Sequence, residues 1–203
     1  MGPILIHFEW HTYELDLINS FSHIQKNYST NLKRNLKNAG NSNLSVVKNT
    51  KPDEIIKLFR DNRGKNINSL SDDDYVKLNR ISYQGIYKGV IQTYGVYSGN
   101  NQLCAAVIFA KSKNKIIFLF SGLSQEGKNT NAMAFLINSF IKEHSMQNLT
   151  LDFEGSNDPN LARFYKSFGS KLCTYPHIRI NKLPIFLNIP FRVYKWYKRN
   201  FNS

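Results

Sequence analysis

Two acidic residues near the end of a predicted strand have the type and spacing for proton transfer. Residues 149–154 alternate apolar and polar side chains, which predicts a β-strand. Asp152 and Glu154 lie two positions apart on it, so we expect their carboxylates on one face, where either could take a proton from an amine, directly or through water. A carboxylate is a weak base unless burial raises its pKa, and we prefer Glu154 as the more mobile acid. The alternative is a packed strand, turn and helix with solvated acids.

A second stretch, residues 121–131, has the composition of an anion-binding loop. It is polar, contains glycine and leads into a predicted helix. Backbone amides at a helix N-terminus, with the positive end of the helix dipole, favour a phosphate group. The residues predicted to contact phosphate are Gly127, Lys128, Asn129, Thr130 and Asn131. A plain capped helix is the alternative interpretation.

Basic residues supply two further candidate contacts for an anion. An amphipathic helix is predicted between Ser20, which can cap its start, and Gly40, which can end it. Lys33 and Arg34 lie on other faces of this helix and could contact a phosphate-bearing substrate, although a solvated face explains them equally. Residues 185–203 interleave aromatic and basic side chains. This appendage suits a membrane surface or RNA, or a helix whose aromatic side covers the core.

The elements that must position these residues follow from the apolar periodicity. Strands are predicted at 13–18, as an edge strand, and at 44–47, 91–97, 103–110, 116–120, 149–154 and 171–180. Further helices are predicted from Pro52, after Ser71, after Asn131 and from Pro159, which Asp158 can cap. The helix between the strands at 116–120 and 149–154 makes those strands parallel neighbours. The expected fold class is α/β (α+β), a mixed, twisted sheet flanked by helices.

The composition limits the class of protein and its partners. The chain has 203 residues, 41% of them hydrophobic, which suits one domain with a real core. Its 27 basic and 14 acidic residues give a net charge of +13, which favours anionic partners such as nucleotide phosphates, nucleic acid or a membrane surface. The two cysteines, Cys104 and Cys173, lie in apolar, strand-like runs, which predicts buried free thiols in a cytoplasmic protein, and no Cys–His spacing indicates a metal site. Residues 1–12 resemble a leader or a truncated start.

Two segments resemble a known family. The run from Asp152 through Phe153 and Glu154 to Gly155, followed by residues 161–169, resembles the end of the acyltransferase domain in Fem-type and related proteins of the GNAT superfamily. Residues 28–39 resemble the early basic helix of the same group. The resemblance covers roughly residues 13–184 and implies a GNAT-like domain there, as the C-terminal half of a two-domain protein. The implied partner is a preceding N-terminal GNAT-like domain.

The resemblance also implies roles for single residues. A tyrosine on the last short helix of GNAT enzymes commonly protonates the departing thiolate, which implies this role for Tyr165, because a phenol with a pKa of about 10 suits the step. Fem-type proteins tend to place a lysine here that meets substrate phosphate, and Lys166 is the adjacent match. The loop that holds the coenzyme A pyrophosphate corresponds to residues 126–132, where Asn129 and Asn131 replace glycines.

The implied activity is transfer of an acyl group from acetyl-CoA or another acyl-CoA to an amine acceptor. One alternative is a Fem-like aminoacyl transfer that uses a charged tRNA as donor. The chain lacks the long heptad run of the helical hairpin that tRNA-using relatives often carry, which favours acyl-CoA. Another alternative is a non-catalytic binding domain of the same fold, which the altered phosphate loop favours.

Overall fold

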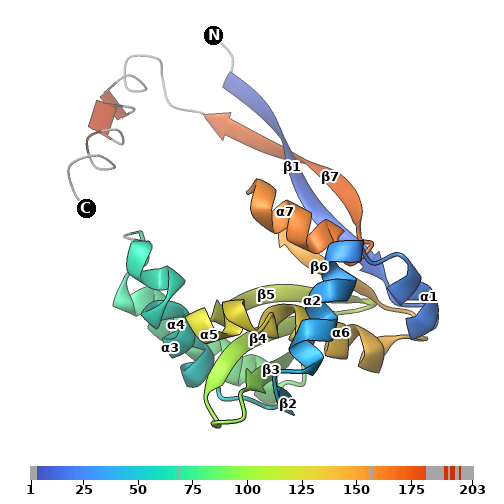
Figure 1. Ribbon diagram of the computed structural model, residues 1–203. Helices are drawn as coiled ribbons and strands as arrows, with labels where there is room; N and C mark the ends of the chain where they lie inside the picture. The colour runs from blue at the N-terminus through green and yellow to red at the C-terminus, as the bar shows by residue number, and fades with distance from the viewer. Residues whose placement is uncertain are drawn as a thin grey trace. The chain divides into compact units, whose positions relative to one another are not determined.

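The structure of the protein is a computed structural model (Figure 1). It describes residues 4–67, 69–155 and 158–181, together with residues 190, 191, 193, 194 and 197. The chain divides into two compact units, one of residues 11–173 and the other of residues 1–10 with 174–203. The candidate site lies within the first unit.

Within the described residues, seven strands form one sheet. They are β1 (Ile4–Asp16), β2 (Ser45–Lys48), β3 (Ile91–Tyr97), β4 (Leu103–Ser112), β5 (Lys115–Leu123), β6 (Thr150–Gly155) and β7 (Lys171–Asn181). Their order is β2-β3-β4-β5-β6-β1-β7, with β5 and β6 parallel and β2 to β5 antiparallel in sequence. The predicted mixed sheet and its parallel pair are therefore confirmed. The prediction that the first strand is an edge strand was wrong, because β1 lies between β6 and β7.

The helices cover both faces of the sheet. They are α1 (Phe21–Lys26), α2 (Thr30–Gly40), α3 (Pro52–Asp61), the 3₁₀ turn η1 (Arg63–Asn66), α4 (Asp72–Tyr87), α5 (Gln125–Asn129), α6 (Ala132–His144) and α7 (Pro159–Lys166). On β4, Ala105, Val107 and Phe109 belong to the large core shared with α6, while Ala106 and Ile108 belong to a smaller core shared with α3. This alternation confirms that the nearly all-apolar strand is central and buried on both faces.

The single helix predicted between Ser20 and Gly40 was wrong, because the chain forms two helices there. The break is at residues 27–29, where the Ser29 side chain accepts a hydrogen bond from the Leu32 amide and so caps α2. The Ser29 amide donates to the carbonyl of Ser167, at the end of α7 (2.9 Å). A local cap and a tertiary hydrogen bond therefore outweigh the continuous apolar periodicity.

The parallel pair β5–β6 is joined only at its start. The paired residues are Lys115 with Thr150, Ile116 with Leu151 and Ile117 with Asp152. Beyond this point β5 continues to Leu123, and β6 follows a β-bulge against β1, where the register shifts between Thr12 and Glu14. The two strands therefore separate, and the space between them is available for a site.

The structure also bears on the predictions for the two ends of the chain and for the cysteines. β1 begins at Ile4, within the stretch that resembled a leader, and Trp10 packs near Tyr175 with ring centroids 6.4 Å apart. Most of the basic appendage 185–203 lies outside the described residues, and the side chains described there, at 190, 191, 193, 194 and 197, are exposed.

Cys104 is buried and Cys173 half-buried, and both are free. Among the described helices, none is both long and apolar enough to cross a membrane.

Candidate functional site

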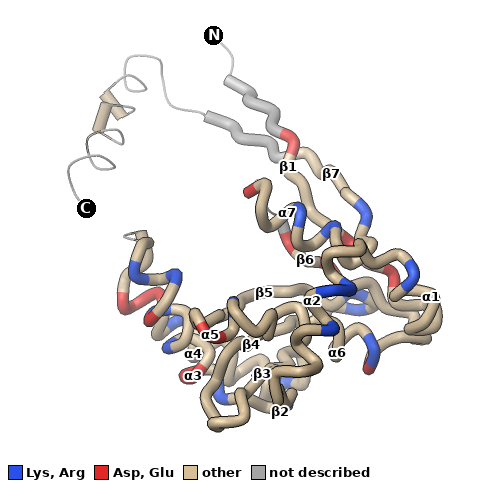
Figure 2. Tube along the Cα trace, viewed as in Figure 1, with Lys and Arg blue, Asp and Glu red and all other residues tan. Residues whose placement is uncertain are grey.

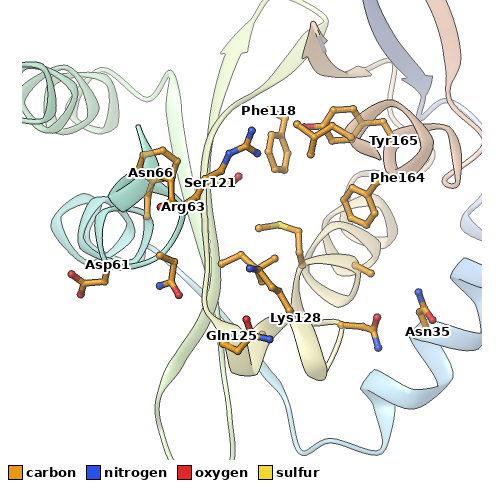
Figure 3. Close-up of a pocket in the computed structure, with 18 residues that line it drawn as sticks. Asn35, Asp61, Arg63, Asn66, Phe118, Ser121, Gln125, Lys128, Phe164 and Tyr165 are labelled. Carbon is orange, nitrogen blue, oxygen red and sulfur yellow. The ribbon is translucent and has the colours of Figure 1, made fainter. Parts of the chain in front are cut away.

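A cavity of about 780 Å³ lies beyond the point where β5 and β6 separate (Figure 3). Its lining comes from elements far apart in the sequence. The lining residues are Asn35 of α2; Phe59, Asp61, Asn62, Arg63 and Asn66 of α3, η1 and the residue between them; Phe118, Ser121 and Leu123 of β5; Gln125, Gly127, Lys128, Asn131, Met133 and Ala134 of α5, α6 and their junction; and Leu161, Phe164 and Tyr165 of α7. The charged residues in this lining are Asp61, Arg63 and Lys128. The cavity is therefore mixed apolar and polar, with more cations than anions.

Tyr165 lies on the cavity wall formed by α7. Its ring is buried and stacks on Phe153 of β6 at 4.8 Å between centroids and 19° between planes. Figure 3 shows the hydroxyl directed toward Phe118 and Arg63. Within the described residues this hydroxyl has no hydrogen-bond partner. Burial raises the pKa of Tyr165, while the charge of Arg63 lowers that pKa and Asp158 raises it. The phenol is therefore protonated at neutral pH.

The start of α6 forms a second wall. Its N-cap, Asn131, has a left-handed backbone (φ 57°) and makes no side-chain capping hydrogen bond. As at the start of any α-helix, the amides of Ala132, Met133 and Ala134 have no acceptor within their own helix. Asn131, Met133 and Ala134 line the cavity, as does Lys128 of α5. These amides, the helix dipole and a lysine together suit an anion.

The open loop predicted over residues 121–131 was wrong in its structure. Ser121 and Leu123 belong to β5, and Ser124 then caps the one-turn helix α5 by accepting a hydrogen bond from Gly127. Four of the amides predicted to contact phosphate therefore have acceptors within this turn. Besides Gly127, Lys128 donates to Ser124 (3.0 Å), Thr130 to Glu126 (2.9 Å) and Asn131 to Lys128 (3.3 Å). The helix start that lines the cavity is instead that of α6, through Asn131, Met133 and Ala134.

Gly127 is required by packing. It is buried in α5, and a Cβ atom at this position would lie 2.2 Å from the carbonyl oxygen of Cys104. The glycine therefore lets α5 approach the backbone of β4. Its position on the cavity wall follows from this approach, and its predicted contact with phosphate remains untested.

Asp152 is buried in a polar network. Its carboxylate accepts hydrogen bonds from the hydroxyl of Thr12 (2.5 Å) and the Glu154 amide (2.9 Å), and it pairs with Lys115 (3.2 Å), which also pairs with Glu14 (2.5 Å). Asp152 does not belong to the cavity lining. These contacts tie β1, β5 and β6 together at the closed end of the parallel pair.

The prediction that Glu154 shares a face with Asp152 was wrong. Glu154 has a left-handed backbone (φ 63°) at the bulge of β6, so strand alternation ends before it. Its side chain is exposed, and it is absent from the described cavity lining. The structure therefore separates the two acids that the strand pattern placed together, and neither lies beside Tyr165 in the cavity wall.

The three predicted basic contacts lie on exposed surfaces. Lys33 donates to the carbonyl of Lys26 at the end of α1 (3.0 Å), and Arg34 donates to the Asn31 side chain (2.7 Å). Lys166 is exposed at the end of α7. Of the other predicted residues, Asn129 and Thr130 lie outside the cavity lining.

The wall opposite α7 was missed by sequence reasoning. It carries Arg63 with Asn62 and Asn66, around the turn η1. The sequence predicts only the end of a helix at Gly64, and the basic Arg63-Gly64-Lys65 turn is the one local signal that could have indicated a site. Among the described residues, no group of three or more His, Cys, Asp or Glu side chains could hold a metal ion.

Comparison with known proteins defines the fold. No family model matches the chain, and no curated protein matches its sequence. Solved structures match well: FemX (TM-score 0.66, 13% identity, 88% of this chain and 63% of that chain), L-PGS from Bacillus licheniformis (0.58, 8%, 91% and 64%), and an Enterococcus faecalis V583 protein described as "Probable N-Acyltransferase" (0.51, 14%, 85% and 40%).

These matches show that the chain has a GNAT-like fold, in agreement with its mixed seven-stranded sheet. The chain spans less than two thirds of the length of each of these three structures. At 14% identity or less, the likeness defines the fold and leaves the substrates to be inferred from the site.

Proposed function

We propose that the cavity is the active site of an N-acyltransferase that moves an acyl group from an acyl-CoA to an amine. One observation carries the proposal. The same cavity is lined by Tyr165 and by the start of α6, and within the described residues the Tyr165 hydroxyl forms no hydrogen bond. A proton donor and an anion site in one cavity are what an acyl thioester with a distant phosphate requires.

The donor's pyrophosphate would lie at the start of α6. There Asn131, Met133 and Ala134 at the start of α6 line the cavity with the positive end of the helix dipole, and Lys128 adds a full charge. Of the predicted phosphate contacts, Lys128 and Asn131 keep a direct role in this arrangement, Lys128 through its ammonium group and Asn131 through its side chain.

Tyr165 would handle the proton at the reacting centre. The amine nitrogen attacks the thioester carbonyl carbon, the carbon–sulfur bond breaks, and the Tyr165 hydroxyl gives its proton to the leaving sulfur. The phenolate then takes a proton from the acylated nitrogen, directly or through water, so that the phenol is restored. Burial raises the pKa of Tyr165, which keeps the phenol protonated at the start and makes the phenolate basic enough to recover its proton.

A calorimetric titration with acetyl-CoA tests the donor site. Micromolar binding by the native chain, weakened about tenfold by Lys128→Gln, is the expected result, because one charge-assisted contact to phosphate is lost. Lys142→Gln, on the exposed far end of α6, is the matched control and should bind like the native chain. The absence of binding at millimolar acetyl-CoA would overturn the acyl-CoA proposal.

Aminoacyl transfer from a charged tRNA is the second candidate. Helices α1, α2 and α7 contain no Asp or Glu, whereas their basic residues are Lys26, Lys33, Arg34, Lys37, Arg163 and Lys166 (Figure 2). Helices α2 and α7 also contribute to the cavity lining, so a polyanionic donor could lie across them with its acyl end inside. The shared fold with FemX supports this candidate.

Binding of charged tRNA across a salt series tests the second candidate. Affinity that falls steeply with salt, and that falls further in Lys33→Gln/Arg34→Gln, would support a phosphate-backbone contact on α2. Salt-independent binding, or none, would exclude it. If neither donor binds, a non-catalytic domain of this fold remains the third alternative.

A further inference from the structure

The turn between α3 and α4 places an arginine at the cavity. Arg63 is the first residue of η1 and belongs to the cavity lining. Figure 3 shows its side chain directed toward Phe118 and the Tyr165 hydroxyl. Its charge influences Tyr165, so the guanidinium and the phenol share one end of the cavity.

Among the described residues, Arg63 differs from its neighbour Arg60 in having no ion-pair or hydrogen-bond partner, and its side chain is exposed at the cavity. Arg60 pairs with Asp72 and lies 4.7 Å above the ring of Tyr75, contacts that join α3 to α4. Arg63 forms no ion pair or hydrogen bond with any residue that the structure describes. An arginine that faces a cavity without a partner retains all its donors for a ligand.

The cavity therefore has cations at two separate places. Lys128 and the start of α6 lie at one place, and Arg63 lies beside Tyr165 at the other. Asp61, the acid of the lining, points away from both cations in Figure 3. If the α6 end holds the donor phosphates, the anion at Arg63 belongs to the other substrate, because a thioester near Tyr165 carries no charge there.

We propose that Arg63 is an acceptor-binding residue, which holds a carboxylate or phosphate group carried by the acceptor close to its reactive amine. The planar guanidinium donates two parallel hydrogen bonds to either group, which would orient the amine toward the thioester carbonyl. Asn66 lines the same turn and adds an amide donor, whereas the Asn62 side-chain amide donates to the carbonyl of Leu58 (2.8 Å). This inference rests on the proposed acyl transfer, and it specifies the acceptor as an anionic amine.

Calorimetric binding of three small amines tests the inference without any need for turnover. The probes are O-phosphoethanolamine and β-alanine, which separate phosphate from carboxylate, and ethanolamine, which carries neither. We expect the native chain to bind at least one anionic amine at millimolar concentration and to bind ethanolamine at least about tenfold more weakly. Arg63→Gln should weaken the binding of the anionic amine by about tenfold or more. Arg63→Lys should weaken it by less, because lysine keeps the charge and loses only the two parallel N–H donors of the guanidinium.

Two control variants separate a local contact from general electrostatics. Lys65→Gln removes a charge from the same turn at an exposed position outside the cavity lining and should leave amine binding unchanged. Lys128→Gln should weaken the binding of acetyl-CoA and leave the binding of the anionic amine unchanged. Arg63→Gln should weaken the binding of the anionic amine and leave the binding of acetyl-CoA unchanged. Equal weakening of both ligands by Arg63→Gln, or equal affinity for ethanolamine and the anionic amines, would overturn the inference.

The outcomes also distinguish this inference from the proposed function. Acetyl-CoA binding without any binding of the anionic amines would contradict the proposed Arg63 subsite and would remain consistent with the proposed transferase. Arg63-dependent amine binding without acetyl-CoA binding supports the subsite and removes the acyl-CoA donor. If transfer is observed, Arg63→Gln should raise KM for the anionic amine with little change in kcat. A loss of kcat that is equal for ethanolamine would show a role at the reacting carbonyl instead, and overturn the assignment.

Discussion

The two ends of the β5–β6 pair differ in whether their polar side chains have protein partners. At the closed end, Lys115 pairs with Glu14 and Asp152, and Asp152 also accepts from Thr12, so the buried carboxylate is fully engaged. At the open end, Arg63 and the Tyr165 hydroxyl face a cavity, and the described residues offer them no partner. Buried polar groups are normally paired, and Tyr165 is buried, whereas Arg63 is exposed at the cavity. We therefore interpret the closed end as a structural polar network and the open end as a ligand-binding site.

The largest expected effect is at the open end. Tyr165→Phe removes only the hydroxyl, so acyl transfer should slow by about a hundredfold or more, because a general acid is lost. The free energy of unfolding should change little, since the stacking on Phe153 is kept. Single-turnover transfer and urea unfolding measure the two quantities. Tyr13→Phe, on β1 outside the cavity lining, is the matched control. An unchanged transfer rate in Tyr165→Phe would remove the proton-donor role.

The next largest effect is expected at the closed end, where a substitution should change the stability and leave ligand binding unchanged. Asp152→Asn removes a buried charge from the network and should lower the free energy of unfolding by about 2 kcal/mol. Acetyl-CoA affinity should be retained, since Asp152 is outside the cavity lining. Urea unfolding and calorimetry measure these quantities. A variant as stable as the native chain but much slower in transfer would instead make Asp152 the catalytic base that the sequence predicts.

A smaller change is expected at the bulge that separates the two ends. Glu154 holds a left-handed backbone that glycine adopts without strain, so Glu154→Gly should raise the free energy of unfolding by about 0.5–1 kcal/mol. Glu154→Ala removes the same carboxylate and keeps the strain, so it should not stabilise. Unfolding experiments on both variants test the backbone. Slower transfer in both variants would support the predicted base role of Glu154, and an unchanged rate would exclude it.

The smallest effect is a pH dependence of the closed end. The hydrogen bond to Glu14 raises the pKa of Lys115 above its ordinary value, with Asp152 adding to the effect. Because the folded-state pKa is the higher one, the stabilisation is fully present below about pH 10.5, the unfolded value, and is lost as pH rises through the folded pKa. Lys115 is 41% exposed, so we expect less than about 1 kcal/mol.

Urea unfolding at about pH 8 and about pH 11 measures this dependence. The difference in the free energy of unfolding between the native chain and Lys115→Met should narrow at the higher pH. Lys111→Met, at an exposed position on β4, serves as the control and should show no such narrowing. A difference that stays constant across this range would show that the ion pairs of Lys115 contribute nothing measurable.

Local patterns predicted most of the elements and failed where distant contacts intervene. The Ser71 cap of α4 and the Asp158 cap of α7 are both present, and β3 spans residues 91–97 as predicted. The acids 152 and 154 were assigned to one face because a regular strand alternates, but the bulge against β1 changes the backbone at Glu154. Arg63 was missed because nothing within its own turn indicates the cavity.

The sequence by itself determined the mixed sheet, the strand buried on both faces and the helix caps, because periodicity and capping depend on residues a few positions apart. Only the tertiary structure decided which groups share the cavity. The separation of β5 from β6 and the approach of α5 to the β4 backbone at Gly127 are packing outcomes. The meeting of Arg63 with Tyr165 is another, since contacts between distant segments depend on how complete elements pack against one another.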